Sequence, residues 1–86
     1  MAKYEISVKK SAIKELENIQ KKELQKLVKK IQALSEEPRP QGSQKLSRKE
    51  QYRIRQGDYR AIYSIDDDNL NVYIIKVGHR KEIYRL

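Results

Sequence analysis

The clearest alternation of apolar and polar residues lies in the segment 52–65. In residues 52–55 a tyrosine and an isoleucine alternate with two arginines, so an extended strand would place the apolar pair on one face and both guanidiniums on the other. A glycine-containing turn at 56–58 leads into residues 59–65, where the alternation recurs. The pattern predicts a β-hairpin that carries three cations on one face, namely Arg53, Arg55 and Arg60.

Two further segments have the pattern of strands. Residues 70–77 are apolar on both faces over most of their length, which favours an interior strand. Residues 4–8 alternate throughout and favour a short edge strand, which we expect along the free side of 70–77. The last strands are also predicted to leave an apolar floor beside the arginines, formed by Ile62, Tyr73, Ile75 and Val77.

Helical periodicity occupies the region between the first strand and the prolines. Ile13 and Leu16 begin one apolar stripe, and a second runs from Leu24 to Leu34 at spacings of three and four residues. The spacing predicts two helices, at about 10–19 and 22–35, with a break near Gln20; a single bent helix is the alternative. Two prolines then end the second helix, and a loop of about ten residues follows.

These elements define a fold class. The helices can bury their apolar stripes only against the apolar face of the sheet. The sequence therefore predicts an α+β fold in which two N-terminal helices pack on one face of a mainly antiparallel four-stranded sheet, in the order β-α-α-β-β-β. With 86 residues, we expect a single domain over residues 1–86.

The net charge limits the classes of partner that we expect the chain to bind. Twenty Lys and Arg against twelve Asp and Glu give a net charge of +8, which favours RNA, DNA, an acidic protein or an anionic membrane. One histidine and no cysteine leave no recognisable metal site, so we expect neither metal nor cofactor. The chain shows neither a signal peptide nor an apolar run of about 18 residues, which predicts a cytoplasmic protein with no membrane partner.

One set of residues could bind phosphate and take part in a reaction. Guanidinium groups match pairs of phosphate oxygens, and several of them around one phosphate would stabilise the charge that develops during phosphoryl transfer. A tyrosine beside cations and a histidine are the groups that can move a proton. For any single arginine, ordinary solvation of a strand is an equally good explanation. The set comprises Arg53, Arg55, Arg60, His79, Arg80, Tyr84 and Arg85.

At these residues the chain resembles a known family. The segments YRIRQGDYRAIYSID and VYIIKVGHRKEIYR are similar to the RelE/ParE superfamily of bacterial and archaeal toxins, in particular its RelE branch. The most specific parts are Y-R-x-x-Y at 59–63 and V-G-H-R at 77–80. The resemblance covers nearly the whole chain. It implies a RelE-like fold and a toxin of a type II toxin–antitoxin system that enters the ribosomal A site and cleaves the mRNA codon there.

The resemblance also implies roles for the candidate residues. The reaction would be metal-independent transesterification by the ribose 2′-OH, so the protein would be an endoribonuclease, or mRNA interferase, that inhibits translation. Its partners would be the ribosome, the mRNA and a cognate antitoxin, with which it would form an oligomeric complex. The implied catalytic residues are Arg60, Arg80 and Tyr84, with Tyr84 as base or orienting group. The implied RNA-binding residues are Arg53, Arg55, His79 and Arg85.

Two other functions fit parts of the sequence. A ParE-like toxin would poison DNA gyrase without cutting RNA, and a third possibility is a non-catalytic nucleic-acid-binding module. The joint presence of Arg60, Arg80 and Tyr84 counts against the ParE-like interpretation, whereas an absence of cleavage with ribosomes present would identify the binding module.

Overall fold

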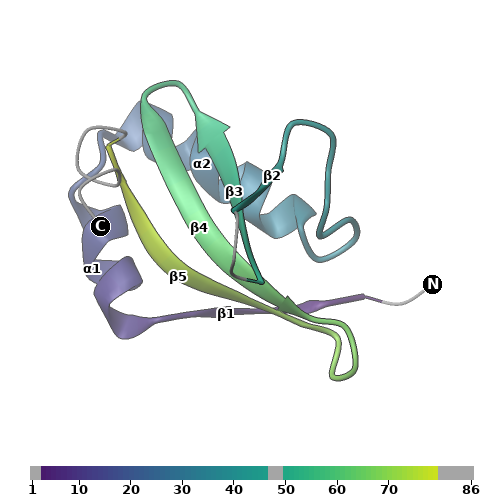
Figure 1. The fold of residues 1–86 in the computed structure, drawn as a ribbon. Helices are drawn as coiled ribbons and strands as arrows, with labels where there is room; N and C mark the ends of the chain where they lie inside the picture. The colour runs from purple at the N-terminus through teal and green to yellow at the C-terminus, as the bar shows by residue number, and fades with distance from the viewer. Residues whose placement is uncertain (1–2, 47–49, 80–86) are drawn as a thin grey trace.

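The computed structural model describes residues 3–46 and 50–79, which form a sheet with a helical layer on one side (Figure 1). In this view α2 lies behind the sheet and α1 stands at the left beside β5, so the face of the sheet opposite α2 is toward the reader. In chain order the elements are β1 (Glu5–Val8), α1 (Lys10–Glu17), α2 (Lys21–Ala33), β2 (Gln44–Leu46), β3 (Gln51–Gln56), β4 (Tyr59–Asp66) and β5 (Asn71–His79).

The sheet confirms the predicted architecture, with one additional strand. Its strand order is β1-β5-β4-β3-β2. β1 lies beside β5, the neighbour predicted for the N-terminal strand, and the structure shows that this pairing is parallel, whereas the other neighbours are antiparallel. The prediction of four strands missed β2, because its three residues show no apolar alternation and are mostly exposed. The α+β class and the position of both helices on one face are confirmed.

The two helices supply one side of the hydrophobic core. α1 ends at Glu17 and α2 begins at Lys21, which places the break where it was predicted. Within the described ranges, neither helix is long and apolar enough to cross a membrane. Helix side chains meet the inner face of β3, β4 and β5 in a cluster whose fully buried members include Ala12, Leu27, Leu34, Ala61, Tyr63, Val72 and Ile74.

A β-bulge changes the faces of the last strand. The register between β4 and β5 shifts near the middle of β4, and Ile75 is left without a paired residue. Beyond this point the alternation is reversed, so Val77 is a core residue at 1% exposure and Lys76 lies on the opposite face. The prediction that Val77 belongs to the apolar floor is therefore wrong. The sequence gives no sign of the extra residue in β5, because this strand is apolar on both faces over most of its length.

The proline loop after α2 is fastened to the sheet by tyrosines. The hydroxyl of Tyr63 donates a buried hydrogen bond of 2.8 Å to the carbonyl of Pro38. Tyr63 stacks on Tyr52 with ring centroids 5.9 Å apart, and the guanidinium of Arg39 lies 5.2 Å from the centre of the Tyr52 ring. These contacts fix the start of the loop relative to β3 and β4.

Candidate nucleic-acid interface

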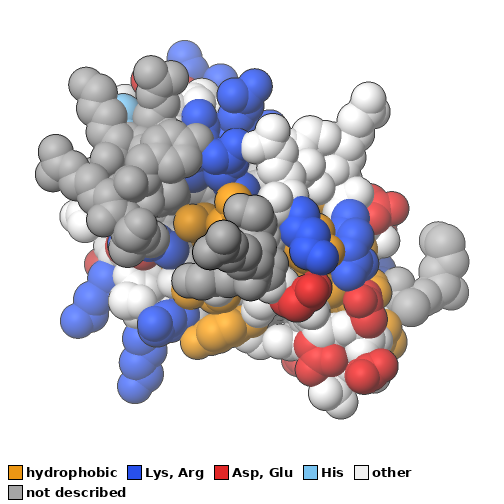
Figure 2. Space-filling view, viewed as in Figure 1, with side chains coloured by type: hydrophobic (Ala, Val, Ile, Leu, Met, Phe, Trp, Pro, Cys, Tyr) orange, Lys and Arg blue, Asp and Glu red, His pale blue; other side chains and the backbone are white. Residues whose placement is uncertain are grey.

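Three arginines lie on the sheet face opposite the helices, which we call the arginine face. Arg55 pairs directly with Arg60 across β3 and β4, and Arg53 pairs with Ile62, so all four side chains project to the same side. The prediction that the three arginines share a face is confirmed. In Figure 2, which looks onto this face, blue cationic side chains adjoin orange hydrophobic ones.

Arg60 is almost completely buried. Arg60 is 5% exposed, so ordinary solvation, the alternative explanation for an arginine on this face, does not apply to it. Its Nη1 lies 3.4 Å from the carbonyl oxygens of Gly57 and Tyr59, and its Nε has no hydrogen-bond partner within residues 3–46 and 50–79. No ion pair joins it to any carboxylate of the described residues. Among the described residues, this guanidinium has lost water without gaining a counter-ion.

The neighbouring arginines increase the positive charge around Arg60. Like charges directly opposite one another on paired strands are destabilising, and Arg55 stands opposite Arg60. Arg55 is exposed and has no side-chain partner among the described residues. Arg53, half-buried, donates a hydrogen bond to Gln44 on β2. The arrangement can bind phosphate oxygens and stabilise negative charge that develops on them.

The apolar floor beside the arginines is present, apart from Val77. Ile62 is buried and Ile75 is half-buried; both line a hollow on this side of the sheet. Tyr73 is 37% exposed. Lys76 also belongs to this face, where it forms a 3.0 Å ion pair with Glu15 of α1. Sequence reasoning missed Lys76 because the bulge that turns it outward has no signature in the sequence.

His79 lies on the other side of the sheet. It pairs with Tyr59, whose side chain packs against the core, and their rings meet edge to face with centroids 5.7 Å apart. The His79 Nε2 atom is 4.0 Å from Oδ2 of Asp58. His79 therefore lies apart from the arginine face, and its role as an RNA contact stays a prediction. The bulge at Ile75 is the cause, because strict alternation would have turned His79 outward.

The remaining candidate residues fall outside the described ranges. Arg80, Tyr84 and Arg85 are in this group, so their predicted roles stay predictions. In the part of the chain that is described, no group of three His, Cys, Asp or Glu residues is positioned to hold a metal ion.

Two sequence comparisons identify relatives of this chain. The family described as "ParE toxin of type II toxin-antitoxin system, parDE" matches residues 6–84. Toxin RelG of Mycobacterium tuberculosis is 47% identical over 34 residues. This match covers 40% of the chain and 39% of RelG, so the chain spans about two fifths of the length of that curated relative.

Solved structures extend the similarity over most of the fold. The toxin–antitoxin complex RelBE2 from Mycobacterium tuberculosis matches with a TM-score of 0.78 and 30% identity, covering 91% of this chain and 99% of the other. The archaeal RelE–RelB complex from Pyrococcus horikoshii matches with a TM-score of 0.81 and 29% identity, covering 93% and 97%.

Proposed function

This chain belongs to the ParE toxin family of type II toxin–antitoxin systems, within the RelE/ParE superfamily, and we propose that it acts as a RelE-like endoribonuclease. Its substrate is the mRNA codon in the ribosomal A site. The proposal favours the RelE activity over the ParE activity because the chain resembles RelE toxins at the residues expected to handle phosphate, and RelE complexes are among its structural relatives.

The observation that carries the proposal is the buried guanidinium of Arg60. It has no carboxylate partner among the described residues, and a second arginine, Arg55, stands directly opposite it. Both features cost stability in the free protein. Both become favourable when a phosphate anion approaches, because each guanidinium then gains a charge-assisted hydrogen bond. Sites that sacrifice stability in this way are typical of function.

The proposed reaction needs no water and no metal. A base removes the proton of the ribose 2′-OH, and the 2′ oxygen attacks the adjacent phosphorus. The bond from phosphorus to the 5′ oxygen breaks, and that oxygen leaves and takes up a proton. The products are an upstream RNA with a 2′,3′-cyclic phosphate and a downstream RNA with a 5′-OH.

Each candidate residue has a role in this scheme. Tyr84 is the base or orients the 2′-OH, as the family resemblance implies. Arg60 and Arg80 stabilise the negative charge of the pentacovalent transition state. Arg53 and Arg55 contact phosphates of mRNA or ribosomal RNA, and Arg85 is an additional RNA contact. His79 keeps its proposed role as an RNA contact. Because it does not lie on the arginine face, it can contact only RNA that reaches the edge of the sheet.

The structural relatives suggest the regulation of this activity. RelBE2 is described as a toxin–antitoxin complex and the archaeal relative as a RelE–RelB complex, and we propose that this chain likewise binds a cognate antitoxin in an oligomeric complex. Residues 1–86 would act as one toxin domain in the cytoplasm. An acidic or apolar antitoxin segment would complement the arginine face and its apolar floor.

The test is cell-free translation with mapping of mRNA ends. We expect cuts within A-site codons, with a cyclic phosphate upstream and a 5′-OH downstream, and cleavage that survives chelation of free divalent metal while ribosomes stay intact. Replacing the 2′-OH of the scissile nucleotide by hydrogen should abolish the cut. Continued cleavage of the 2′-deoxy substrate, or a 5′-phosphate product, would identify water as the nucleophile and reject this mechanism.

The second candidate is a gyrase-poisoning toxin, favoured by the description of the matching family as ParE. The same purified protein can be assayed for inhibition of gyrase supercoiling. Inhibition without any mRNA cleavage would select this function. Binding of RNA without either activity would select a nucleic-acid-binding module.

A further inference from the structure

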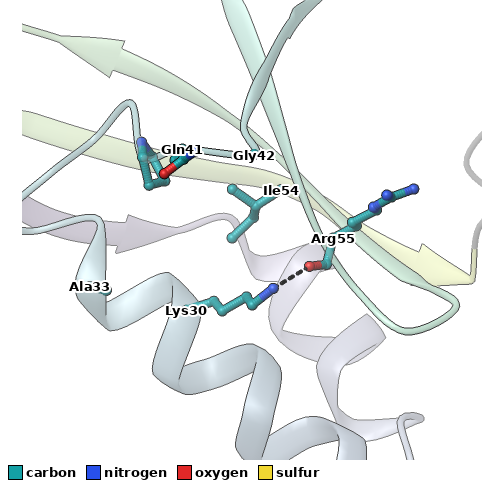
Figure 3. Close-up of a pocket in the computed structure, with 7 residues that line it drawn as sticks. Lys30, Ala33, Gln41, Gly42, Ile54 and Arg55 are labelled. Carbon is teal, nitrogen blue, oxygen red and sulfur yellow. Dashed lines mark hydrogen bonds between the residues drawn. The ribbon is translucent and has the colours of Figure 1, made fainter.

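A pocket opens where the arginine face ends at the edge of β3, and we call it the edge pocket (Figure 3). Its volume is about 250 Å³. Ala33 at the end of α2, Pro40 in the loop and Ile54 on β3 form its apolar walls, and Gln41 lies at its mouth. Pockets for drug-sized ligands hold about 300–1,000 Å³, so this one suits a single flat ring system.

The pocket exists because β2 is shorter than β3. β2 pairs only with residues 51–53, and this leaves the edge of β3 open from Ile54 onward. The carbonyl of Arg55 on that edge accepts a 2.8 Å hydrogen bond from Nζ of Lys30. Figure 3 shows this bond at the floor, with the Arg55 guanidinium extending away from α2. The bond ties the helix to the strand edge, so the floor is formed before any ligand arrives.

The loop at the mouth is also fixed. The amide of Ser43 donates a 3.0 Å hydrogen bond to the carbonyl of Pro40, and Gly42 has a φ of +96°. A closing bond with positive φ at the third residue defines a type II turn, which needs glycine at that position. Gln41 occupies the second position of the turn, where its amide can reach a ligand in the pocket.

A second hollow of about 270 Å³ adjoins the edge pocket and has a different chemical character. Gly42 and Arg55 line both, and the second hollow adds polar side chains from Ser43, Gln44 and Arg53. The two hollows together form a bipartite site around the edge of the sheet. One part is apolar with an amide at its mouth, and the other is cationic.

We propose that this bipartite site holds one nucleotide of the RNA strand, with its base in the edge pocket and its phosphate between Arg53 and Arg55. Single-stranded RNA is recognised through bases that are splayed out of the stack and held between apolar side chains, while cations bind the phosphates. Gln41 reads the edge of the base through its amide. The site would therefore contribute to codon preference. This proposal depends on the proposed function in one respect: that function identifies mRNA as the source of the bound nucleotide.

The test begins without ribosomes. Isotope-labelled protein is titrated with each of the four ribonucleoside 5′-monophosphates and, separately, with inorganic phosphate, and chemical shifts are followed by NMR. We expect phosphate to perturb the side chains of Arg53 and Arg55, together with Arg60 opposite Arg55, and to leave the Gln41 amide and the Ile54 methyl groups unchanged. Nucleotides should also perturb the Gln41 amide and the Ile54 methyl groups.

Matched variants on α2 locate the binding. Ala33→Leu fills the edge pocket, and Gln25→Leu places the same side chain at an exposed position of α2 that does not line it. Ala33→Leu should weaken nucleotide binding by about tenfold, the effect of losing one well-held base, and leave phosphate binding unchanged. Gln25→Leu should behave like the parent. A nucleotide response that matches the phosphate response, or equal behaviour of the two variants, would overturn the proposal.

Two further measurements separate this proposal from the proposed function. In cell-free translation, Ala33→Leu should alter the distribution of cut codons, whereas Gln25→Leu should not. If the parent protein binds nucleotides at Gln41 and Ile54 but never cleaves mRNA, the nucleotide site stands and the ribonuclease does not. Perturbation of these residues by an antitoxin peptide but by no nucleotide would assign the pocket to a protein partner and overturn the proposal.

Discussion

The guanidinium of Arg39 is bound by both carboxylate oxygens of Asp67, at 3.3 and 2.9 Å. The hydroxyl of Tyr4 donates a 2.7 Å hydrogen bond to the same carboxylate. Asp67 lies in the turn between β4 and β5, so one side chain connects that turn to the proline loop and to the start of the chain. The hydrogen bonds from Arg39 and then Tyr4 lower the pKa of Asp67.

This lowered pKa predicts a loss of stability in acid. The unfolded carboxyl has a pKa near 3.9, and the folded one is lower, so the contribution is present above that value and disappears as the pH falls through the folded pKa. Thermal unfolding from about pH 6 to about pH 2 measures it. Asp67→Asn should flatten part of this dependence. Asp68→Asn, at an exposed position in the same turn, is the control and should leave it unchanged.

A second prediction concerns alkaline pH. Burial of the Tyr63 phenol raises its pKa to about 12. Because the unfolded phenol titrates near 10, the folded state keeps its full stability below about pH 10 and loses it as the pH rises through the folded pKa. Denaturant unfolding at pH 8, 10 and 11 should show this decline, and Tyr63→Phe should remove much of it. A parent protein whose stability is flat over this range would contradict the assignment.

A third prediction separates activity from stability at Arg60. Arg60→Met keeps most of the apolar volume and removes a buried charge that has no carboxylate partner among the described residues. Cleavage in the ribosome assay should fall about a hundredfold or more, since one stabiliser of transition-state charge is gone. The melting temperature should stay the same or rise. A fall of more than about 5 °C would mean that Arg60 supports the fold, and its proposed catalytic role would lose its main argument.

The fourth prediction tests the packing of the helical layer. Leu27 is fully buried between α2 and the sheet. Leu27→Ala should reduce the free energy of unfolding by about 2–5 kcal/mol, measured by urea denaturation. Gln25→Ala, on the exposed side of the same helix, should change it by less than about 0.5 kcal/mol. Equal effects of the two substitutions would contradict the helix orientation.

The sequence was sufficient for most of the fold because its periodicities are strong. The stripe from Leu24 to Leu34 identified α2, and the alternation around Arg53 and Arg60 identified the arginine face. Both patterns reflect which face of an element is buried. In a regular helix or strand the same face is buried along the whole element, so the periodicity of apolar residues reveals it.

The parts of the site that could not be predicted depend on departures from regularity. One unpaired residue, Ile75, reverses the faces of everything after it in β5, which places Val77 in the core instead of the predicted floor and leaves His79 away from the arginine face. The burial of Arg60 depends on tertiary packing rather than on its position in a strand. The edge pocket depends on the difference in length between β2 and β3. The sequence of neither strand indicates the residue at which it ends.

The parallel pairing of β1 with β5 has a consequence for how the chain folds during its synthesis. Glu5 pairs with Asn71 and Val8 with Ile74, so the first strand to leave a translating ribosome needs the last strand as its partner. Because such a contact closes nearly the whole chain into a loop, it forms late and slowly. The sheet therefore stays incomplete while its own message is being read. Under the proposed function, a toxin whose sheet is completed only once β5 has been synthesised would spare the ribosome that made it.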